Sequence, residues 1–276
     1  MVVARYAVMG HPVAHSLSPV IHHLFAEQVG RQLVYEKIQI DLPRFEEQVV
    51  DFFHQGGMGL NITLPCKPRA FAMSAQVSAR ALEAQAANTL WMEAGCLHAD
   101  NTDGVGLLRD IRRYEVLTGK NILLLGAGGA ARGILGPLLM EKPAELIVCN
   151  RTIERARQLQ RLFPGITICT MTELPKIAKK NVFDVVINAT PSNFQDDQNI
   201  FSSMLSAAQP FCYDLFYRHD EATAFVALAR SVGCMAVDGL GMLVEQAAES
   251  FFIWHRIMPN TTPVLDYLLH KRTVAS

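Results

Sequence analysis

A short apolar run that ends in a glycine turn constrains this chain more than any other feature. Ile122–Leu125 leads directly into the small residues of Gly126–Ala131, and an apolar, alanine-rich helical pattern follows. Gly126, Gly128 and Ala131 have the spacing G-x-G-x-x-G/A, in the strand, turn and helix context in which that motif binds a dinucleotide. The helix N-terminus would offer unpaired N–H groups to a pyrophosphate. The alternative is a glycine turn that only joins two packed elements.

Strands and helices alternate regularly after this turn. Short apolar runs predict strands, and amphipathic or apolar stretches between them predict helices. This alternation is typical of a doubly wound parallel sheet of the Rossmann type. We expect strands over 121–125, 145–149, 166–169, 182–188 and 211–214, and helices over 130–140 and 153–162.

The first hundred residues predict a second α/β unit without a glycine fingerprint. Ser18 is a good N-cap and Pro19 suits a first helical turn, so we expect a helix to begin there. Two late helices, from about Gly241 to Trp254 and from Pro263 to His270, are expected to return to this unit. We therefore predict a substrate-binding domain formed by 1–102 and 241–276, and a nucleotide-binding domain formed by 103–240.

Composition excludes several classes of protein. The formal net charge of −1 over 276 residues provides no basic surface for nucleic acid. The six cysteines are scattered without a C-x-x-C pair, and no H-E-x-x-H is present, so we expect neither a disulfide framework nor a metal site. We expect no signal peptide, no membrane association and a cytoplasmic location. The oligomeric state is left open by the sequence, which is compatible with a homodimer.

The end of the second strand of the nucleotide-binding unit indicates which coenzyme binds. NAD-binding folds place an Asp or Glu there to accept hydrogen bonds from the ribose 2′-hydroxyl. Here the position reads Asn150-Arg151-Thr152, and Arg155 follows one turn later. Guanidinium groups suit a 2′-phosphate, so we predict NADP. The alternative is a pair of solvated arginines at a helix start.

Polar residues in the first unit suggest where a substrate binds. They gather after predicted strands, where open α/β sheets bind ligands. Hydroxyl groups there can donate to a carboxylate, and a lysine can transfer a proton while a carboxylate holds it in place. Each residue also has a structural alternative, since a serine or aspartate can simply cap a helix and a lysine can be solvated. The residues are Ser16, Ser18, Thr63, Lys67, Asn88 and Asp103.

The order of these motifs resembles the shikimate dehydrogenase family over nearly the whole chain. The resemblance is carried by His15-Ser16-Leu17-Ser18-Pro19, Asn61-Ile62-Thr63-Leu64-Pro65-Cys66-Lys67, Ala87-Asn88-Thr89, Asn101-Thr102-Asp103-Gly104, Gly126-Ala127-Gly128-Gly129-Ala130, Asn150-Arg151-Thr152, Asn188-Ala189-Thr190 and the segment Asp238–Ala248.

The resemblance implies reversible, NADPH-dependent reduction of 3-dehydroshikimate to shikimate, on the route to chorismate and the aromatic amino acids. It implies that Lys67 exchanges the proton and is paired with Asp103. Carboxylate binding would fall to Ser16 and Ser18, and binding of the ring hydroxyls to Thr63, Lys67, Asn88, Asp103, Tyr217 and Gln246. The residues that would bind NADP are Gly126, Ala127, Gly128, Gly129, Ala130, Asn150, Arg151, Thr152 and Arg155, with Leu215 and Gly239 near the nicotinamide.

The chain departs from the family pattern in four places. Cys66 replaces the usual Phe before the lysine, Pro68 replaces an acidic residue after it, and Ala79 replaces a Glu. The segment Asp214–Tyr217 continues with Arg-His instead of Lys-Pro. Two other functions remain open at this stage: a paralogue that uses quinate as well as shikimate with NAD, and a ligand-binding regulator without catalytic activity.

Overall fold

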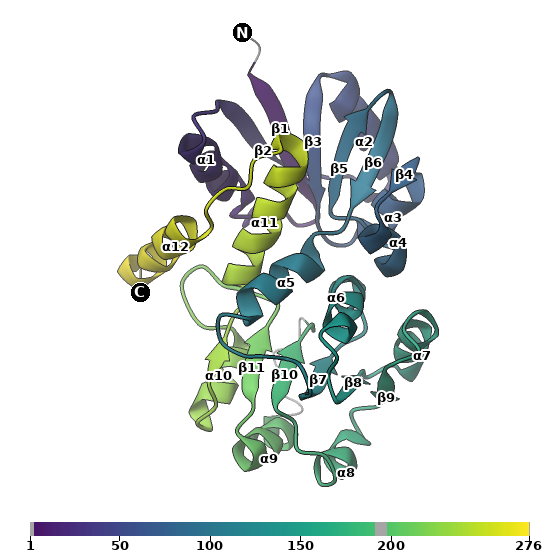
Figure 1. Ribbon diagram of the computed structural model, residues 1–276, viewed down its shortest axis with the longest axis vertical. Coiled ribbons are helices and arrows are strands. Elements are labelled where there is room, and N and C mark those ends of the chain that lie inside the picture. The colour runs from purple at the N-terminus through teal and green to yellow at the C-terminus, as the bar shows by residue number, and fades with distance from the viewer. Residues whose placement is uncertain (1–2, 191–197, 276) are drawn as a thin grey trace. The chain divides into compact units, whose positions relative to one another are not determined.

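The computed structural model describes residues 3–190 and 198–275, which divide into two compact units. The first contains Met1–Gly106 and Leu243–Leu268, and the second contains Leu107–Met242 and Leu269–Ser276. Each unit is built on a six-stranded sheet (Figure 1). The two-domain division expected from the sequence has somewhat different bounds, and it stays a prediction.

The sheet of the first unit is mixed. Its strand order is β2-β1-β3-β5-β6-β4; β1 is parallel to β2 and β3, and β5 is antiparallel to β3 and β6. The strands are β1 (Ala4–Gly10), β2 (Leu33–Gln39), β3 (Gly57–Ile62), β4 (Gln76–Val77), β5 (Thr89–Glu93) and β6 (Cys96–Asp100). The helical segments are α1 (Ser18–Gln28), the 3-10 turn η1 (Leu42–Arg44), α2 (Phe45–His54), α3 (Lys67–Met73), α4 (Ala79–Ala84), the start of α5 (Asp103–Ile111) and most of α11 (Leu240–His255).

Alternate residues of β1 cover the two faces of this sheet, as the period of a strand requires. On one face Met9 joins a buried cluster with Phe45 and Phe52 of α2. On the other face the ring of Tyr6 lies 4.9 Å from that of Trp254 on α11. The sequence from Leu243 onward in α11 is therefore part of the core of the first unit.

The second unit has the predicted Rossmann topology. All its neighbouring strands are parallel, in the order β12-β11-β10-β7-β8-β9, with the order reversing beside β7. The strands are β7 (Asn121–Leu125), β8 (Glu145–Cys149), β9 (Thr167–Cys169), β10 (Val185–Asn188), β11 (Phe211–Asp214) and β12 (Ala236–Val237). The helices are α6 (Gly129–Met140), α7 (Ile153–Leu162), α8 (Leu174–Ala178), α9 (Gln198–Ala208) and α10 (Ala224–Ser231). The predicted fold class is confirmed.

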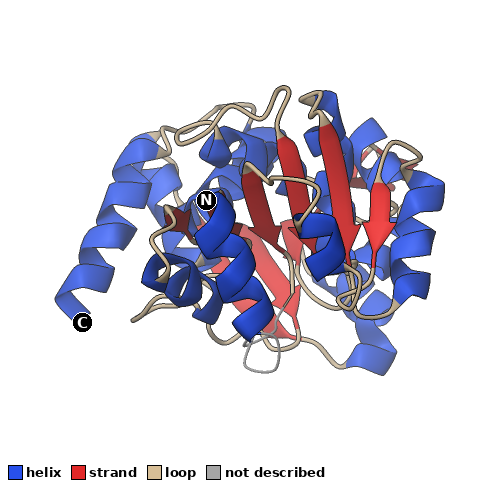
Figure 2. Cartoon of the chain, turned by 90° about the horizontal axis from the view of Figure 1, so that it is seen from below, coloured by secondary structure: helices blue, strands red, loops and turns tan. Residues whose placement is uncertain are grey.

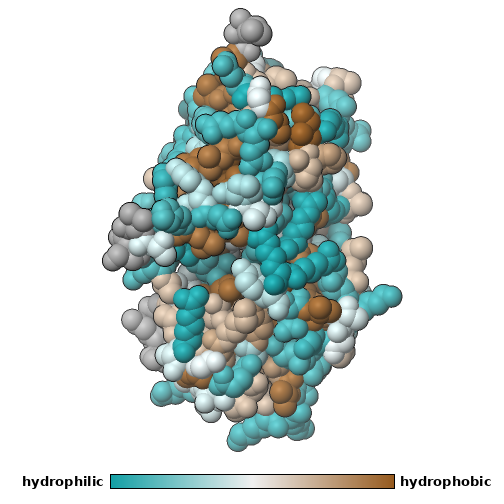
Figure 3. Space-filling model, turned by 60° about the vertical axis from the view of Figure 1, so that its left-hand side comes forward, coloured by the Kyte–Doolittle hydropathy of each residue, from teal (hydrophilic) through white to brown (hydrophobic). Residues whose placement is uncertain are grey.

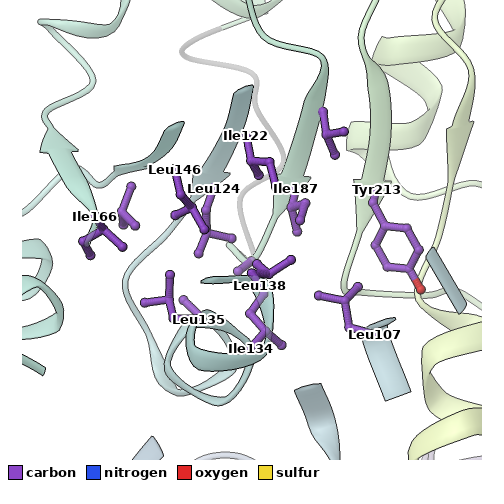
Figure 4. Close-up of a cluster of buried hydrophobic side chains, with 14 of the residues drawn as sticks. Leu107, Ile122, Leu124, Ile134, Leu135, Leu138, Leu146, Ile166, Ile187 and Tyr213 are labelled. Carbon is purple, nitrogen blue, oxygen red and sulfur yellow. The ribbon is translucent and has the colours of Figure 1, made fainter. Parts of the chain in front are cut away.

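Both faces of this parallel sheet are buried, as expected for strands that are apolar throughout. Ile122 and Leu124 of β7 pack with Ile134 and Leu138 of α6 (Figure 4). The intervening residue Leu123 points into a separate cluster with side chains of α8, α9 and α10. Helices accordingly lie on both sides of the strands in Figure 2.

The structure differs from the sequence-based expectations in local details. Helix α1 begins one residue early: its N-cap is Leu17, and Ser18 is already its first helical residue. The predicted Ser18 cap is therefore wrong; instead Ser16 Oγ accepts the backbone N–H of Ser18, at 3.2 Å. The two-residue strands β4 and β12 are not predicted, because such short pairings carry no readable period.

The last helix, α12 (Thr262–Ala275), is shared between the two units. Its residues after Leu268 group with the second unit, where Arg272 Nη1 donates to Asp238 Oδ2 at 2.7 Å. This contact joins the end of α12 to the segment before α11, whereas the sequence predicts that all of 241–276 belongs to the first unit.

The surface mixes hydrophobic and hydrophilic side chains. On the face drawn in Figure 3, brown hydrophobic residues are interspersed with teal hydrophilic ones. Among the described residues, none of the helices has the length and apolar character needed to cross a lipid bilayer.

Candidate active site

The first unit contains a sheltered ion pair between Lys67 and Asp103. Lys67 is the first residue of α3, in the connection after β3, and Asp103 is the first residue of α5, after β6. Lys67 Nζ lies 2.6 Å from Asp103 Oδ2, and the two side chains are only 13% and 6% exposed. The ammonium group is thus held at a fixed point with limited access to water, as an acid–base residue requires.

Asn88 and Gln246 extend this pair into a polar group of four side chains. Asn88 Nδ2 donates to the second carboxylate oxygen, Asp103 Oδ1, at 2.8 Å. It also lies 3.2 Å from Gln246 Oε1, while Gln246 Nε2 donates to the backbone oxygen of Leu243. Both oxygens of Asp103 are therefore occupied by donors, so its carboxylate cannot rotate freely.

The predicted carboxylate-binding serines form a second pair in the first unit. Ser16 Oγ and Ser18 Oγ are 3.1 Å apart, and Ser18 is buried at the start of α1. Thr63 lies just beyond β3, where its backbone N–H donates to Met9 and its methyl group closely approaches Gly10. In the described residues, no hydrogen bond joins these three to the Lys67 group. Their binding roles stay predictions.

The glycine turn of the second unit is built as its sequence predicts. Gly126 has φ = +105°, a conformation that favours glycine, and a Cβ there would lie 2.8 Å from Thr190 Cγ2. Gly128 is the N-cap of α6 and gives that helix no side-chain hydrogen bond. Among the residues that the structure describes, a Cβ at Gly128 would meet no other atom within 4 Å. Ala127, Gly129 and Ala130 complete this turn.

The residues after β8 fit a 2′-phosphorylated dinucleotide. Asn150 Oδ1 accepts the backbone N–H of Ala127 at 3.2 Å, and Asn150 Nδ2 donates to the backbone oxygen of Thr152. Asn150 thereby ties the glycine turn to the start of α7. Arg151 and Arg155 are exposed, and no carboxylate pairs with either in the part of the chain that the structure describes. Two available guanidinium groups, without an acidic residue at the strand end, favour NADP over NAD.

Leu215, Tyr217 and Gly239 lie at the carboxyl ends of β11 and β12. Leu215 N donates to the backbone oxygen of Asn188, and Gly239 N donates to that of Phe216. A Cβ on Gly239 would come within 2.3 Å of the oxygen of Leu215, so only glycine fits this close approach. Tyr217 is half-buried and its ring contacts that of His219. Their predicted roles remain predictions.

Family models match most of the chain in three segments. Residues 8–90 match the shikimate dehydrogenase substrate binding domain. Residues 110–207 match shikimate / quinate 5-dehydrogenase, and residues 239–268 match the shikimate 5′-dehydrogenase C-terminal domain. The chain belongs to the shikimate dehydrogenase family. The resemblance found in the sequence motifs is thus confirmed.

Relatives within the shikimate dehydrogenase family are similar over nearly their full length. A protein of Legionella pneumophila (strain Philadelphia 1) named shikimate dehydrogenase (NADP(+)) is 54% identical over 264 residues, covering 96% of this chain and 98% of that protein. A protein of the same name from Methylobacillus flagellatus is 46% identical over 268 residues, covering 96% and 98%.

Solved structures have the same fold. An Ael1 enzyme from Pseudomonas putida has a TM-score of 0.86 and 41% identity, covering 96% of this chain and 98% of that one. The shikimate 5-dehydrogenase of Thermus thermophilus, solved in complex with NADP(H) and shikimate, has a TM-score of 0.83 and 29% identity, with coverage of 97% and 99%.

Sequence reasoning missed the polar residues that surround Asn88. Thr102 N and Thr102 Oγ1 both contact Asn88 Oδ1, at 2.9 and 3.2 Å. Thr89 and Ser250 form a further layer behind them. Thr89 and Thr102 stand within the quoted motifs, so their position next to Asn88 and Asp103 could have singled them out. Ser250 lies one helical turn after Gln246 in a run that otherwise reads as buried core.

Proposed function

We propose that this member of the family catalyses the reversible, NADPH-dependent reduction of 3-dehydroshikimate to shikimate, in the biosynthesis of chorismate and the aromatic amino acids. The observation that carries this proposal is the sheltered Lys67–Asp103 pair, which Asn88 and Gln246 complete. A carbonyl reduction needs a proton donor beside the carbonyl oxygen, because that oxygen must gain a proton as the carbon is reduced, and the pair supplies one.

Lys67 is the proton donor in this proposal. Its ammonium has three N–H bonds, of which one points to Asp103 Oδ2, so the others remain available to the substrate oxygen. In the direction of reduction the ammonium donates a proton to the oxygen of the carbonyl. In the reverse direction the amine takes the proton of the hydroxyl. Bound NADPH supplies the hydride for the carbon.

Asp103 keeps Lys67 in position and accepts a hydrogen bond from a ring hydroxyl. The polyhydroxy ring requires several groups that both donate and accept, which we propose to be Thr63, Asn88, Gln246 and Tyr217. Ser16 and Ser18 supply hydroxyl groups for the substrate carboxylate, to which neutral donors can bind without the cost of burying a second charge.

The coenzyme is bound by the second unit in this proposal. The N–H groups at the start of α6 face the pyrophosphate, where the positive end of the helix dipole favours an anion. Arg151 and Arg155 bind the 2′-phosphate, while Asn150 keeps the glycine turn and the start of α7 together. Leu215 and Gly239 lie near the nicotinamide.

The proposal is tested by the change in absorbance at 340 nm with purified protein. Shikimate and quinate are each assayed with NADP and with NAD, and we expect the highest kcat/KM for shikimate with NADP. A preference for quinate with NAD would support the paralogue instead. Binding of shikimate without turnover of any of the four pairs would support the ligand-binding regulator and refute the proposed activity.

The catalytic role of Lys67 is tested by Lys67→Ala. General acid–base catalysis contributes roughly 10²–10⁴-fold, so we expect kcat to fall by about that factor. NADPH binding, followed by its fluorescence, should be unchanged. Lys176→Ala, which removes an exposed lysine of α8, is the control and should keep the wild-type kcat. A Lys67→Ala protein with wild-type kcat would exclude Lys67 as the proton donor.

We also propose a cytoplasmic location, which the cysteines support. All six are free thiols, and five of them are buried. A reducing compartment is the usual setting for such a chain. Fractionation of cells that produce the tagged protein tests this location. A homodimer stays a prediction, which sedimentation velocity at micromolar concentration tests.

A further inference from the structure

A cluster of buried hydroxyl groups surrounds the Asn88 amide. Ser250 of α11 is its centre and is 0% exposed. Ser250 Oγ lies 2.7 Å from Thr89 Oγ1 and 3.3 Å from Thr102 Oγ1, and it accepts from Asn61 Nδ2 at 3.0 Å. All five residues belong to the first unit, and none of them except Asn88 has a part in the proposed chemistry.

The backbone fixes which way the Asn88 amide points. The N–H of Thr102 can only donate, and it lies 2.9 Å from Asn88 Oδ1, so that atom must be the amide oxygen. The amide nitrogen then faces Asp103 Oδ1, which can only accept. A flipped amide would place oxygen against the Asp103 carboxylate and N–H against the Thr102 N–H. The orientation of Asn88 therefore decides whether Asp103 is held.

The hydroxyl groups support the same orientation. Thr89 Oγ1 donates to Asn88 Oδ1 at 3.0 Å, which uses the only proton that the Thr89 hydroxyl has. The single proton of Ser250 has two acceptors, Thr89 Oγ1 at 2.7 Å and the backbone oxygen of Gln246 at 3.1 Å, and we assign it to Thr89 because that contact is the shorter. The result is a directed chain of hydrogen bonds from Ser250 to Thr89 to the Asn88 oxygen. Such chains strengthen each member, because each accepted bond polarises the donor that follows.

We propose that Ser250 and Thr89 are positioning residues for the reaction. They hold the Asn88 amide so that its nitrogen binds Asp103, and Asp103 in turn holds the Lys67 ammonium. Neither residue touches substrate or coenzyme. This inference rests on the proposed function. It adds two residues that do not contact Lys67 themselves but act on it through the side chains of Asn88 and Asp103. If the hydroxyl groups merely satisfied one another in the core, their loss would change stability and leave turnover intact.

The test compares Ser250→Ala, Thr89→Val and the double variant in the shikimate and NADP assay. Thr89→Val keeps the shape of the side chain and removes the hydroxyl, and Thr89→Ser restores the hydroxyl. We expect kcat/KM for shikimate to fall about three- to tenfold in each single variant, the magnitude of one neutral hydrogen bond. KM for NADP should not change, and Thr89→Ser should recover most of the activity.

The double variant shows whether Ser250 and Thr89 act through one chain of hydrogen bonds or have two independent effects on kcat/KM. If Ser250 acts through Thr89, its loss adds little once Thr89 has no hydroxyl, so the double variant should resemble Thr89→Val. Glu249→Gln is the control for stability. Glu249 is the neighbour of Ser250 on α11, and its carboxylate lies 2.8 Å from Arg80 Nη1. The substitution weakens this ion pair, which does not involve Asn88. Tryptophan fluorescence during urea unfolding measures the stability of every variant.

Three results would overturn the inference: wild-type kcat/KM in Thr89→Val, multiplied losses in the double variant, or an equal loss in Glu249→Gln at equal stability. A wild-type protein that does not oxidise shikimate would instead refute the proposed function, and the positioning role with it.

Discussion

His22 gives the stability of the first unit a pH dependence that can be calculated. Its ring lies on α1, is fully buried, and stacks on the ring of Tyr35 at 4.3 Å. Burial, with the charge of His255 as a smaller cause, lowers the pKa of His22 to about 3. Neither ring nitrogen has a hydrogen-bond partner of normal geometry in the described residues, although the nearby Asn61 side chain slightly opposes this shift. The folded state therefore favours the neutral ring.

The direction and size of the effect follow from linkage. An unfolded histidine has a pKa of about 6.5, so between pH 6.5 and 3 the unfolded chain binds a proton that the folded chain does not. The contribution of neutral His22 to the free energy of unfolding is fully present above pH 6.5. It falls as the pH is lowered, by at most about 1.4 kcal/mol per pH unit. From pH 7.5 to 4.5 His22 should cost about 3 kcal/mol. His255, with a pKa lowered to about 4 mainly by burial, adds a loss of the same sign.

The assay is urea unfolding followed by tryptophan fluorescence at pH 7.5, 6.5, 5.5 and 4.5. The chain has two tryptophans, Trp91 and Trp254, and both lie in the first unit, so the signal reports that unit. His22→Phe keeps an aromatic ring beside Tyr35 and removes the titrating nitrogens. We expect its loss of stability between pH 7.5 and 4.5 to be smaller than that of the wild type by about 3 kcal/mol.

Two further variants make this prediction decisive. His22→Leu, which is smaller, should show the same reduced pH dependence if the larger Phe ring distorts the core. His23→Gln removes the exposed neighbouring ring on α1 and should keep the wild-type pH dependence. Identical pH dependence in the wild type and both His22 variants would refute the reasoning, because it would mean that the folded state protonates His22 as easily as the unfolded state does.

Three other variants test the coenzyme site and the core. Arg151→Ala should raise KM for NADPH far more than KM for NADH, because only NADPH has the 2′-phosphate; equal changes in the two steady-state KM values would remove Arg151 from that site. Gly126→Ala should lower the melting temperature and NADPH affinity together, because a residue at φ = +105° would be strained by about 1–3 kcal/mol. Arg80→Met should destabilise the first unit by about 3 kcal/mol, since it leaves the buried carboxylates of Asp100 and Glu249 without their cation; an unchanged urea midpoint would contradict this.

Local sequence determined the nucleotide-binding unit to a large extent. The strands over 121–125, 145–149 and 211–214 and the helix over 153–162 have in the structure the bounds that the sequence predicts. These elements are apolar runs or amphipathic stretches separated by glycine or polar turns, so their period and ends are readable in the chain. The glycine turn is a local feature too, and so is the presence of Asn150 instead of an acidic residue at the end of β8. The family resemblance likewise rests on contiguous motifs.

Tertiary structure alone decided how the polar residues of the first unit meet. Four residues from separate segments are joined there by hydrogen bonds: the side chain of Asn61 donates to Asn88 and Ser250, and the side-chain amide of Asn88 donates to Thr102. No local pattern predicts this, because partners distant in the chain are chosen by strand order and by the helix α11, which lies across β3 and β5. The start of α1 shows the same limit at short range: Ser18 has the composition of a cap, but the folded loop gives that task to Ser16. The residue types thus revealed the chemistry available, while packing of distant segments determined which groups face one another and are withdrawn from water.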